Sequence, residues 1–144
     1  MQKTFVPKVK TSQEKAWYIV DATDQIVGKL ATRVADALRG KDKPTFTPHM
    51  DEGAYVIVIN SDKIRFSGSK LADKIYYRHS GYKGGIKAAT AASIMDKNSK
   101  KVVVEAIKNM LPNNKLRKMF LAKLKVFKDA NHDHAAQKPT PLEI

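Results

Sequence analysis

The sequence of 144 residues contains no cysteine. This absence excludes a disulfide scaffold, a thiolate metal site and a cysteine nucleophile together. The sequence also has no apolar run near the roughly 20 residues of a membrane-spanning helix, and residues 1–5 lack the apolar core of a secretory signal. We therefore expect a soluble, intracellular protein with one domain over residues 1–144, whose 42% hydrophobic content is enough for one packed core.

Acidic residues are few beside the basic ones. The chain carries 27 Lys and Arg against 14 Asp and Glu, a formal net charge of +13. Residues 60–128 contain 17 of the basic residues and 4 of the acidic ones, so the whole excess lies in this segment. A surface that merely keeps a protein soluble needs no such segregation. The pattern therefore favours a polyanionic partner, namely nucleic acid.

Hydrophobic periodicity predicts an α/β fold. Apolar runs at residues 16–20 and 55–59 are typical of strands buried on both faces. Between them, apolar residues of 27–38 recur at three- and four-residue spacing, which predicts an amphipathic helix that ends at Gly40. Strand, helix and strand with this spacing form a βαβ unit with parallel strands and a right-handed crossover. Thr23 or Asp24 is expected to cap the helix.

The remaining elements are predicted to be shorter and to complete a small, mostly parallel sheet. Met110 and Met119 are expected on the buried faces of two helices. The predictions are a short edge strand over 63–66, a loop over 76–87, a helix from near Ser99 to Met110 before Pro112, a helix capped by Asn113 or Asn114, a strand at 124–127, and irregular ends at 1–15 and 129–144.

Candidate phosphate and carboxylate sites are incomplete. Val27-Gly28-Lys29 superficially resembles a phosphate-binding loop, but it has one glycine, and Leu30 stands where a hydroxyl residue is needed. Asp21, Asp24 and Asp62 follow predicted strands, where α/β enzymes often place carboxylates. Helix caps and turns account for these aspartates more simply.

Candidate metal and nucleophile sites are incomplete as well. His132 and His134 are two ligands without a third, and Ser80 beside His79 lacks the geometry of a catalytic triad. We expect no catalytic residue, metal or cofactor. A small phosphoester enzyme on a βαβ scaffold is the alternative class, and saturable binding of ATP or magnesium would favour it.

The segment from Tyr76 to Lys87 combines aromatic, basic and glycine residues. Glycines let the backbone approach a phosphate closely, tyrosine and histidine can stack on unpaired bases, and cations bind phosphate oxygens. One of Tyr76 and Tyr77 is expected to face inward. The nucleic-acid contacts predicted in this segment are Tyr77, Arg78, His79, Ser80, Gly81, Tyr82, Lys83, Gly84, Gly85 and Lys87.

A second basic cluster lies further along the chain and begins at the N-terminus of a predicted helix, where the backbone itself favours anions. It consists of Lys115, Arg117, Lys118, Lys123 and Lys125. The nucleic-acid contacts predicted outside the segment from Tyr76 to Lys87 are Lys41, Lys43, Arg65, Lys70, Lys115, Arg117 and Lys118.

With these motifs the sequence resembles the universal family of large-subunit ribosomal protein L13, in its bacterial form. The resemblance runs through nearly the whole chain in the family's order. The matching stretches are Trp17 to Ala22, Arg39-Gly40-Lys41, Thr47-Pro48-His49, Tyr55 to Asn60, Tyr77 to Tyr82 with Gly84-Gly85, Met110 to Asn113, and the tail with His132, His134, Ala136-Gln137 and Pro139. The chain departs from the family pattern at Ala54, Lys83, Asn109, Arg117 and Asp133, changes that keep the basic and aromatic groups.

The resemblance implies a non-enzymatic structural protein that binds large-subunit ribosomal RNA early in subunit assembly, in the cytoplasm and beside neighbouring large-subunit ribosomal proteins. It implies a three-layer α/β/α fold with extended N- and C-terminal arms. It also implies that Tyr77–Gly85 and Lys115–Lys118 face RNA, and that no membrane or small-molecule substrate is involved. A free RNA-binding regulator of translation is the alternative within the nucleic-acid class.

Overall fold

A four-stranded parallel sheet organises the computed structural model, which describes residues 4, 6–8 and 10–144. The strands are β1 (Trp17–Asp21), β2 (Tyr55–Ile59), β5 (Leu124–Val126) and β6 (Thr140–Pro141), in the order β5-β2-β1-β6. β1 pairs with β2 from Trp17↔Tyr55 to Asp21↔Ile59, so the predicted parallel pairing is confirmed. Residues 1–3, 5 and 9 of the predicted N-terminal arm lie outside the described residues.

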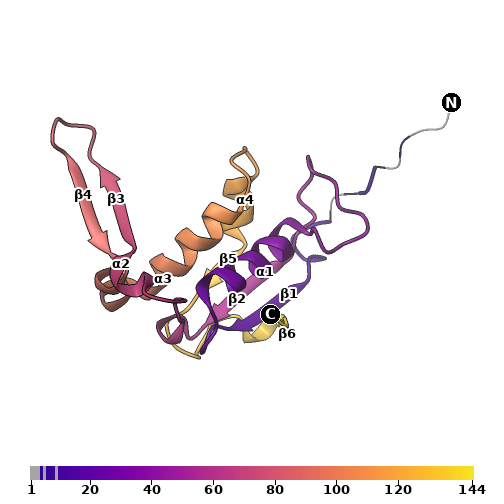
Figure 1. Ribbon diagram of the computed structural model, residues 1–144. Coiled ribbons are helices and arrows are strands. Elements are labelled where there is room, and N and C mark those ends of the chain that lie inside the picture. The colour runs from indigo at the N-terminus through magenta and orange to yellow at the C-terminus, as the bar shows by residue number, and fades with distance from the viewer. Residues whose placement is uncertain (1–3, 5, 9) are drawn as a thin grey trace.

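Helices cover one face of this sheet (Figure 1): α1 (Val27–Arg39), α3 (Ala91–Met110) and α4 (Arg117–Ala122). Val56 and Val58 of β2 point into this layer and are fully buried with Leu30 of α1 and Ile107 of α3. None of the helices in the described residues is long and apolar enough to cross a membrane.

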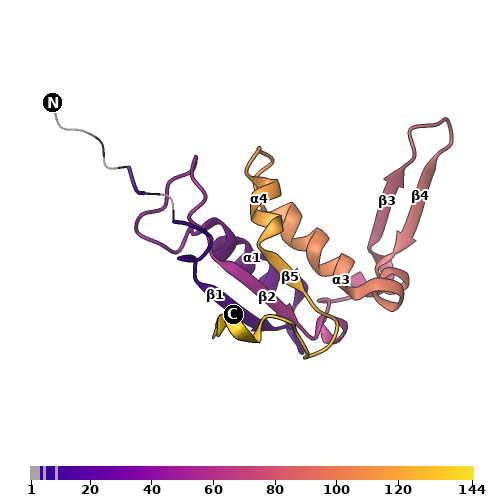
Figure 2. The same ribbon diagram turned by 180° about the vertical axis from the view of Figure 1, so that it is seen from behind.

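The C-terminal tail covers the other face of the sheet (Figure 2). Trp17 stacks on Tyr55 with ring centroids 4.3 Å apart, and the His134 ring of the tail lies 5.3 Å from Trp17. The tail contains the short 3-10 helix η2 (Ala135–Gln137), so the predicted three-layer α/β/α arrangement is present with a reduced outer layer. Because this cover is thin, Trp17 and Tyr55 are only half-buried.

The end of α1 was predicted correctly, whereas its N-cap was not. Gly40 ends the helix in the left-handed conformation, with φ 75°, as predicted. Neither predicted N-cap is used, because Ile26 occupies that position without a side-chain cap. Thr23 donates instead to the Asp21 carboxylate at 2.7 Å, and Asp24 adopts φ 58°, which adds a turn before the helix.

Two predictions in the middle of the chain are wrong. Residues 63–66 form only a single bridge, Ile26↔Arg65, after the 3-10 helix η1 (Ser61–Lys63). Residues 76–87 belong to an antiparallel hairpin of β3 (Ile75–His79) and β4 (Ile86–Thr90), preceded by α2 (Lys70–Asp73). Glycines at the tip and charged residues along the strands conceal the alternation of this hairpin in the sequence.

Helix α3 is longer than predicted because it consists of two segments. Asn98 has non-helical angles, φ −160° and ψ 86°, and its side chain accepts from the Lys101 backbone N–H at 3.3 Å. The second segment therefore has its own cap, and only this segment was predicted from the sequence. Met110 and Met119, expected to be buried, are 51% and 52% exposed.

The end of the chain also departs from expectation. The side chains of Asn113 and Asn114 do not cap α4, whose N-cap position is Leu116. The tail is mostly irregular as expected, but β6 adds a short strand that pairs with β1 in parallel, from Tyr18↔Thr140 to Ile19↔Pro141.

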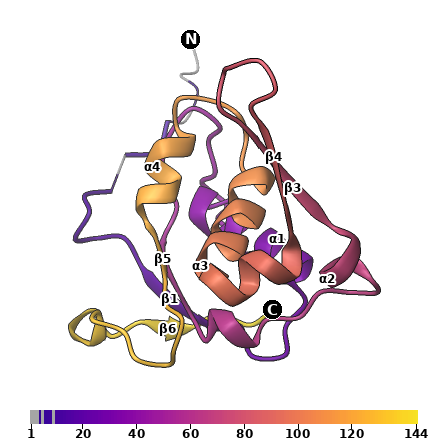
Figure 3. The ribbon, with the colours of Figure 1, turned by 90° about the vertical axis from the view of Figure 1, so that its left-hand side faces the viewer.

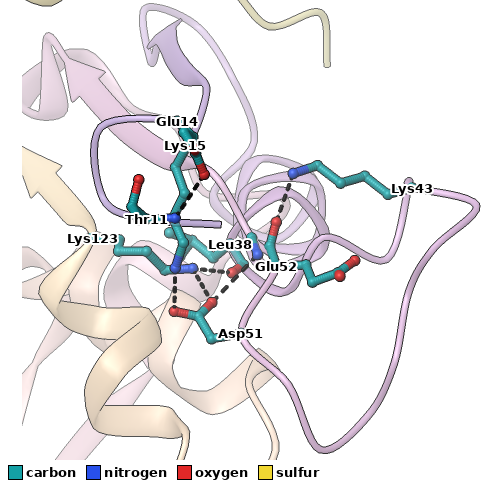
Figure 4. Close-up of polar contacts among 9 residues, drawn as sticks. Thr11, Glu14, Lys15, Leu38, Lys43, Asp51, Glu52 and Lys123 are labelled. Carbon is teal, nitrogen blue, oxygen red and sulfur yellow. Dashed lines mark hydrogen bonds and ion pairs between the residues drawn. The ribbon is translucent and has the colours of Figure 1, made fainter. Parts of the chain in front are cut away.

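A buried ion cluster connects the ends of several elements (Figure 4). The ammonium of Lys123, between α4 and β5, donates to the Asp51 carboxylate and to the Leu38 carbonyl, the latter at 2.9 Å. Lys15 donates to the other Asp51 oxygen at 2.8 Å. A Cβ at Gly53 would lie 1.6 Å from the Leu38 carbonyl oxygen, so only glycine fits there. We call Lys15, Asp51 and Lys123 the ion cluster.

Burial changes the acidity of both central groups. Burial raises the pKa of Asp51, but the hydrogen bonds and charges of Lys123 and Lys15 outweigh it and hold this pKa below its ordinary value of 3.8. Burial lowers the pKa of Lys123 to about 8, against the opposing effect of Asp51. Both groups are therefore charged at neutral pH.

Removal of the Asp51 carboxylate is expected to be strongly destabilising. Asp51→Ala leaves the Lys123 ammonium buried without its anion, which is expected to lower the free energy of unfolding by about 3–5 kcal/mol. Asp36→Ala is the matched control, because it removes the exposed pair with Lys41 at 3.9 Å, which is worth about 0–1 kcal/mol. Urea denaturation measures both, and equal losses would contradict the structural role of the ion cluster.

The same carboxylate is expected to make stability sensitive to acid. Because the pKa of Asp51 is lowered on folding, its contribution is fully present above pH 3.8 and is lost as the pH falls through the lowered pKa. The unfolding free energies of the wild type and of Asp51→Asn should therefore converge as the pH falls below 3.8. Curves that remain parallel in an acid denaturation series would refute this assignment.

Candidate nucleic-acid interface

The hairpin of β3 and β4 projects away from the sheet (Figure 1). Five residue pairs join its strands, from Ile75↔Thr90 to His79↔Ile86. At its base, the Ala91 backbone N–H donates to the Lys74 carbonyl at 2.9 Å. Almost all side chains of the hairpin are exposed, so the contact residues predicted there lie on an accessible surface.

Local hydrogen bonds shape the hairpin tip. Ser80 donates its backbone N–H to the Gly85 carbonyl, and Gly85 donates to the Tyr82 carbonyl, at 3.0 and 2.9 Å. Gly81 and Gly84 adopt φ 91° and 67°, in the left-handed region. A Cβ at Gly85 would lie 2.0 Å from the Ser80 hydroxyl oxygen. These glycines therefore have a folding role, whereas their close approach to RNA stays a prediction.

The two faces of the hairpin differ in character. Side chains alternate along each strand, so Tyr76, Arg78 and Lys87 share the face toward α3. Tyr76 is half-buried, whereas Tyr77 on the opposite face is 66% exposed. The expectation that one of these two tyrosines faces inward is therefore confirmed.

The hairpin lies beside α3 (Figure 3). Side chains of the inner hairpin face and of α3 line a cleft of about 680 Å³. Within the described part of the chain, only Lys108 among its cations forms an ion pair, with Glu105 at 3.5 Å. The remaining cations have no carboxylate partner there, so the cleft has an uncompensated positive charge. The basic residues that line it are Arg78, Lys87, Lys97, Lys101 and Lys108.

The α3 residues of this cleft were not predicted from the sequence. Lys101, Glu105 and Lys108 are separated by four and three positions, a spacing that places them on one side of the second segment of α3, and Lys97 lies just before the break at Asn98. This spacing lies within the helix predicted from near Ser99 to Met110, but it was not used to predict a contact. In addition, no local pattern indicates that a hairpin packs beside α3.

The other predicted contacts lie on separate segments. The Lys43 ammonium donates to the Glu52 carbonyl at 2.6 Å, and the Arg117 guanidinium donates to the Leu111 carbonyl at 2.8 Å. Lys123 does not belong to an exposed cluster as expected, because it is buried in the ion cluster. The exposed cations are Lys41 beside Asp36, Arg65 beside Asp24, Lys70 on α2, and Lys115 and Lys118 around the start of α4.

Three segments that carry predicted contacts, the hairpin tip among them, nevertheless lie at the same end of the molecule. Figures 1 and 3 show the hairpin tip, the connection from α3 to α4 and the loop after α1 pointing in the same direction. They contain the predicted contacts of residues 80–85, Lys115 and residues 41–43, respectively, and Arg117 and Lys118 follow in the first turn of α4. A long polyanion could therefore contact all three at once.

The tail histidines have a packing role in the structure. His132 and His134 lie beside Phe127, with ring centroids 6.2 and 5.9 Å away. In the described residues, no three His, Cys, Asp or Glu side chains come together as metal ligands.

Comparison with known proteins gives one consistent family. The protein-family model described as "Ribosomal protein L13" matches residues 15–133. Proteins named large ribosomal subunit protein uL13 are similar over their length. Those of Synechococcus sp. (strain RCC307) and Symbiobacterium thermophilum are 50% and 49% identical over 144 residues, all of this chain and 95% and 100% of theirs. That of Kocuria rhizophila is 50% identical over 142 residues, 99% of this chain and 96% of its own. The chain therefore belongs to the ribosomal protein L13 family.

Proposed function

We propose that this chain binds large-subunit ribosomal RNA through the β3–β4 hairpin, the facing side of α3 and the connection between α3 and α4. Its binding supports early assembly of the subunit. The segments around Lys41 and Lys115 extend the contact along the same end of the molecule. Neighbouring large-subunit ribosomal proteins are further partners.

Family membership supplies the frame of this proposal. As a member of the ribosomal protein L13 family, the chain is a structural component of the large ribosomal subunit and is not an enzyme. It is a protein of the ribosome in the bacterial cytoplasm. The proposal adds which surface binds the RNA.

The observation that carries the proposal is the group of cations without carboxylate partners in the hairpin cleft. Arg78, Lys87, Lys97 and Lys101 line it, and none has an ion-pair partner among the residues described by the structure. Cations brought together in this way repel one another unless an anion joins them. Phosphate groups of RNA provide such anions, and their displaced counterions contribute to binding. The exposed Tyr82, Lys83 and His79 at the tip add groups that can stack on bases or contact phosphates.

Removal of hairpin cations should weaken RNA binding and flatten its dependence on salt. Each phosphate contact contributes about 0.7–0.9 to the slope of log K against log salt. Arg78→Ala and Lys87→Ala should each remove about one phosphate contact and so reduce the steepness of this slope by about 0.7–0.9. Filter binding to a transcript of large-subunit ribosomal RNA at several salt concentrations gives the slope.

Lys29→Ala is the matched control, because Lys29 is an exposed cation on α1, away from the hairpin. Its salt slope should equal that of the wild type. If all three variants changed the slope equally, the charge of the whole protein would drive binding and not this surface.

Distortion of the hairpin tip should reduce affinity without loss of stability. Gly85→Ala places a Cβ against the Ser80 hydroxyl and 2.8 Å from the Tyr82 carbonyl oxygen, so the tip must change shape. The hairpin projects from the sheet, and its tip does not contribute to the buried core. We expect weaker RNA binding with a melting temperature within about 4 °C of the wild type, which corresponds to less than about 1 kcal/mol. A parallel fall in melting temperature and affinity would show that the tip is structural.

A further inference from the structure

One carboxylate lies in the otherwise basic cleft between the hairpin and α3. Of the four acidic residues in segment 60–128, only Glu105 lines this cleft. A cleft that bound phosphates alone would gain nothing from a carboxylate, because like charges repel. A carboxylate can instead accept hydrogen bonds from the N–H groups of a base.

We propose that this cleft receives one unpaired guanine base of the RNA, with Glu105 and Lys108 as its recognition groups. This assignment rests on the RNA-binding function proposed above and specifies the ligand of its central cleft. Sequence-specific contacts to RNA commonly use unpaired bases, whose Watson–Crick edges are accessible to side chains.

The arrangement of donors and acceptors selects guanine. Glu105 and Lys108 lie one helical turn apart on α3, and the Lys108 ammonium is 3.5 Å from Glu105 Oε1. Guanine presents two adjacent N–H donors, N1 and N2, beside the O6 acceptor. A carboxylate can accept both N–H groups, and an adjacent ammonium can donate to O6.

The other bases satisfy this pair less completely. Adenine and cytosine each present one amino donor beside a ring-nitrogen acceptor, and uracil presents one N–H between two acceptors. Each of them leaves one carboxylate oxygen without a donor from the base edge. A polar group left without a partner in a cleft costs affinity, so the pair discriminates against these bases.

The remaining walls of the cleft fit a nucleotide. The half-buried Tyr76 provides an aromatic wall next to Glu105, and burial together with the charge of Glu105 raises the pKa of the Tyr76 hydroxyl. Arg78 and Lys87 lie opposite each other on the same hairpin face and can bind the flanking phosphates. The volume of about 680 Å³ is within the range of about 300–1,000 Å³ typical of small-ligand sites.

Kethoxal probing tests this assignment directly, because kethoxal reacts with N1 and N2 of unpaired guanines. Large-subunit ribosomal RNA is probed alone and with saturating wild-type protein, Glu105→Gln or Asp96→Asn. We expect at least one guanine to be protected by the wild type and to become reactive again with Glu105→Gln. Glutamine offers one acceptor and one donor, so it cannot accept both guanine N–H groups.

Asp96→Asn is the matched control, since Asp96 is an exposed carboxylate on the same helix that does not line the cleft. It should give the wild-type protection pattern. Protection that is identical with Glu105→Gln and the wild type, or absent with both, would overturn the guanine assignment. Filter binding of the same complexes distinguishes the two proposals. If the wild type binds the RNA in a salt-dependent way but no protection depends on Glu105, only the guanine site is refuted. If the wild type does not bind the RNA, the RNA-binding function itself is refuted.

Discussion

The buried charge of Lys123 is the constraint on which the body of this structure depends. Lys123 is only 4% exposed, so its ammonium requires an anion and further acceptors, and Asp51 and the Leu38 carbonyl supply them. These partners come from the loop before β2 and from the end of α1, while Lys15 adds the segment before β1. The requirement for glycine at position 53 follows from the same close approach. The ion cluster thus holds together the segments that precede β1, β2 and β5 and the end of α1.

The structure uses its cations in two different ways. Lys15 and Lys123 both form ion pairs with Asp51 inside the protein, where they contribute to folding. The cations of the hairpin and of α3 lie outside the core and, apart from Lys108, lack carboxylate partners in the described part of the chain. Because the hairpin projects from the sheet, its surface takes no part in the buried contacts between α1, α3 and β2. Net charge alone does not reveal this division.

Elements with a strong local signal could be predicted from the sequence. The apolar runs of β1 and β2, the periodicity of α1 and the glycine after it gave the βαβ unit, and the family resemblance gave the layers. The hairpin was missed because the alternation of residues 75–90 places an aromatic and two cations on the inner face, which resembles a loop in composition. The predicted N-cap of α1 was wrong because Thr23 bonds to Asp21 instead of the helix. The cleft depends on how the hairpin packs beside α3, which no local pattern specifies.

The central proposal is that the surface around the hairpin, and not the exposed face of α1, makes the principal contact with RNA. Photocrosslinking in purified large subunits tests it most directly, with p-benzoylphenylalanine introduced at Tyr82 in one variant and at Lys29 in another. Both positions are exposed, at the hairpin tip and on α1 respectively. The account predicts strong crosslinks to ribosomal RNA from position 82 and weak ones from position 29. Crosslinks to RNA from position 29 alone, or crosslinks only to protein from position 82, would contradict it.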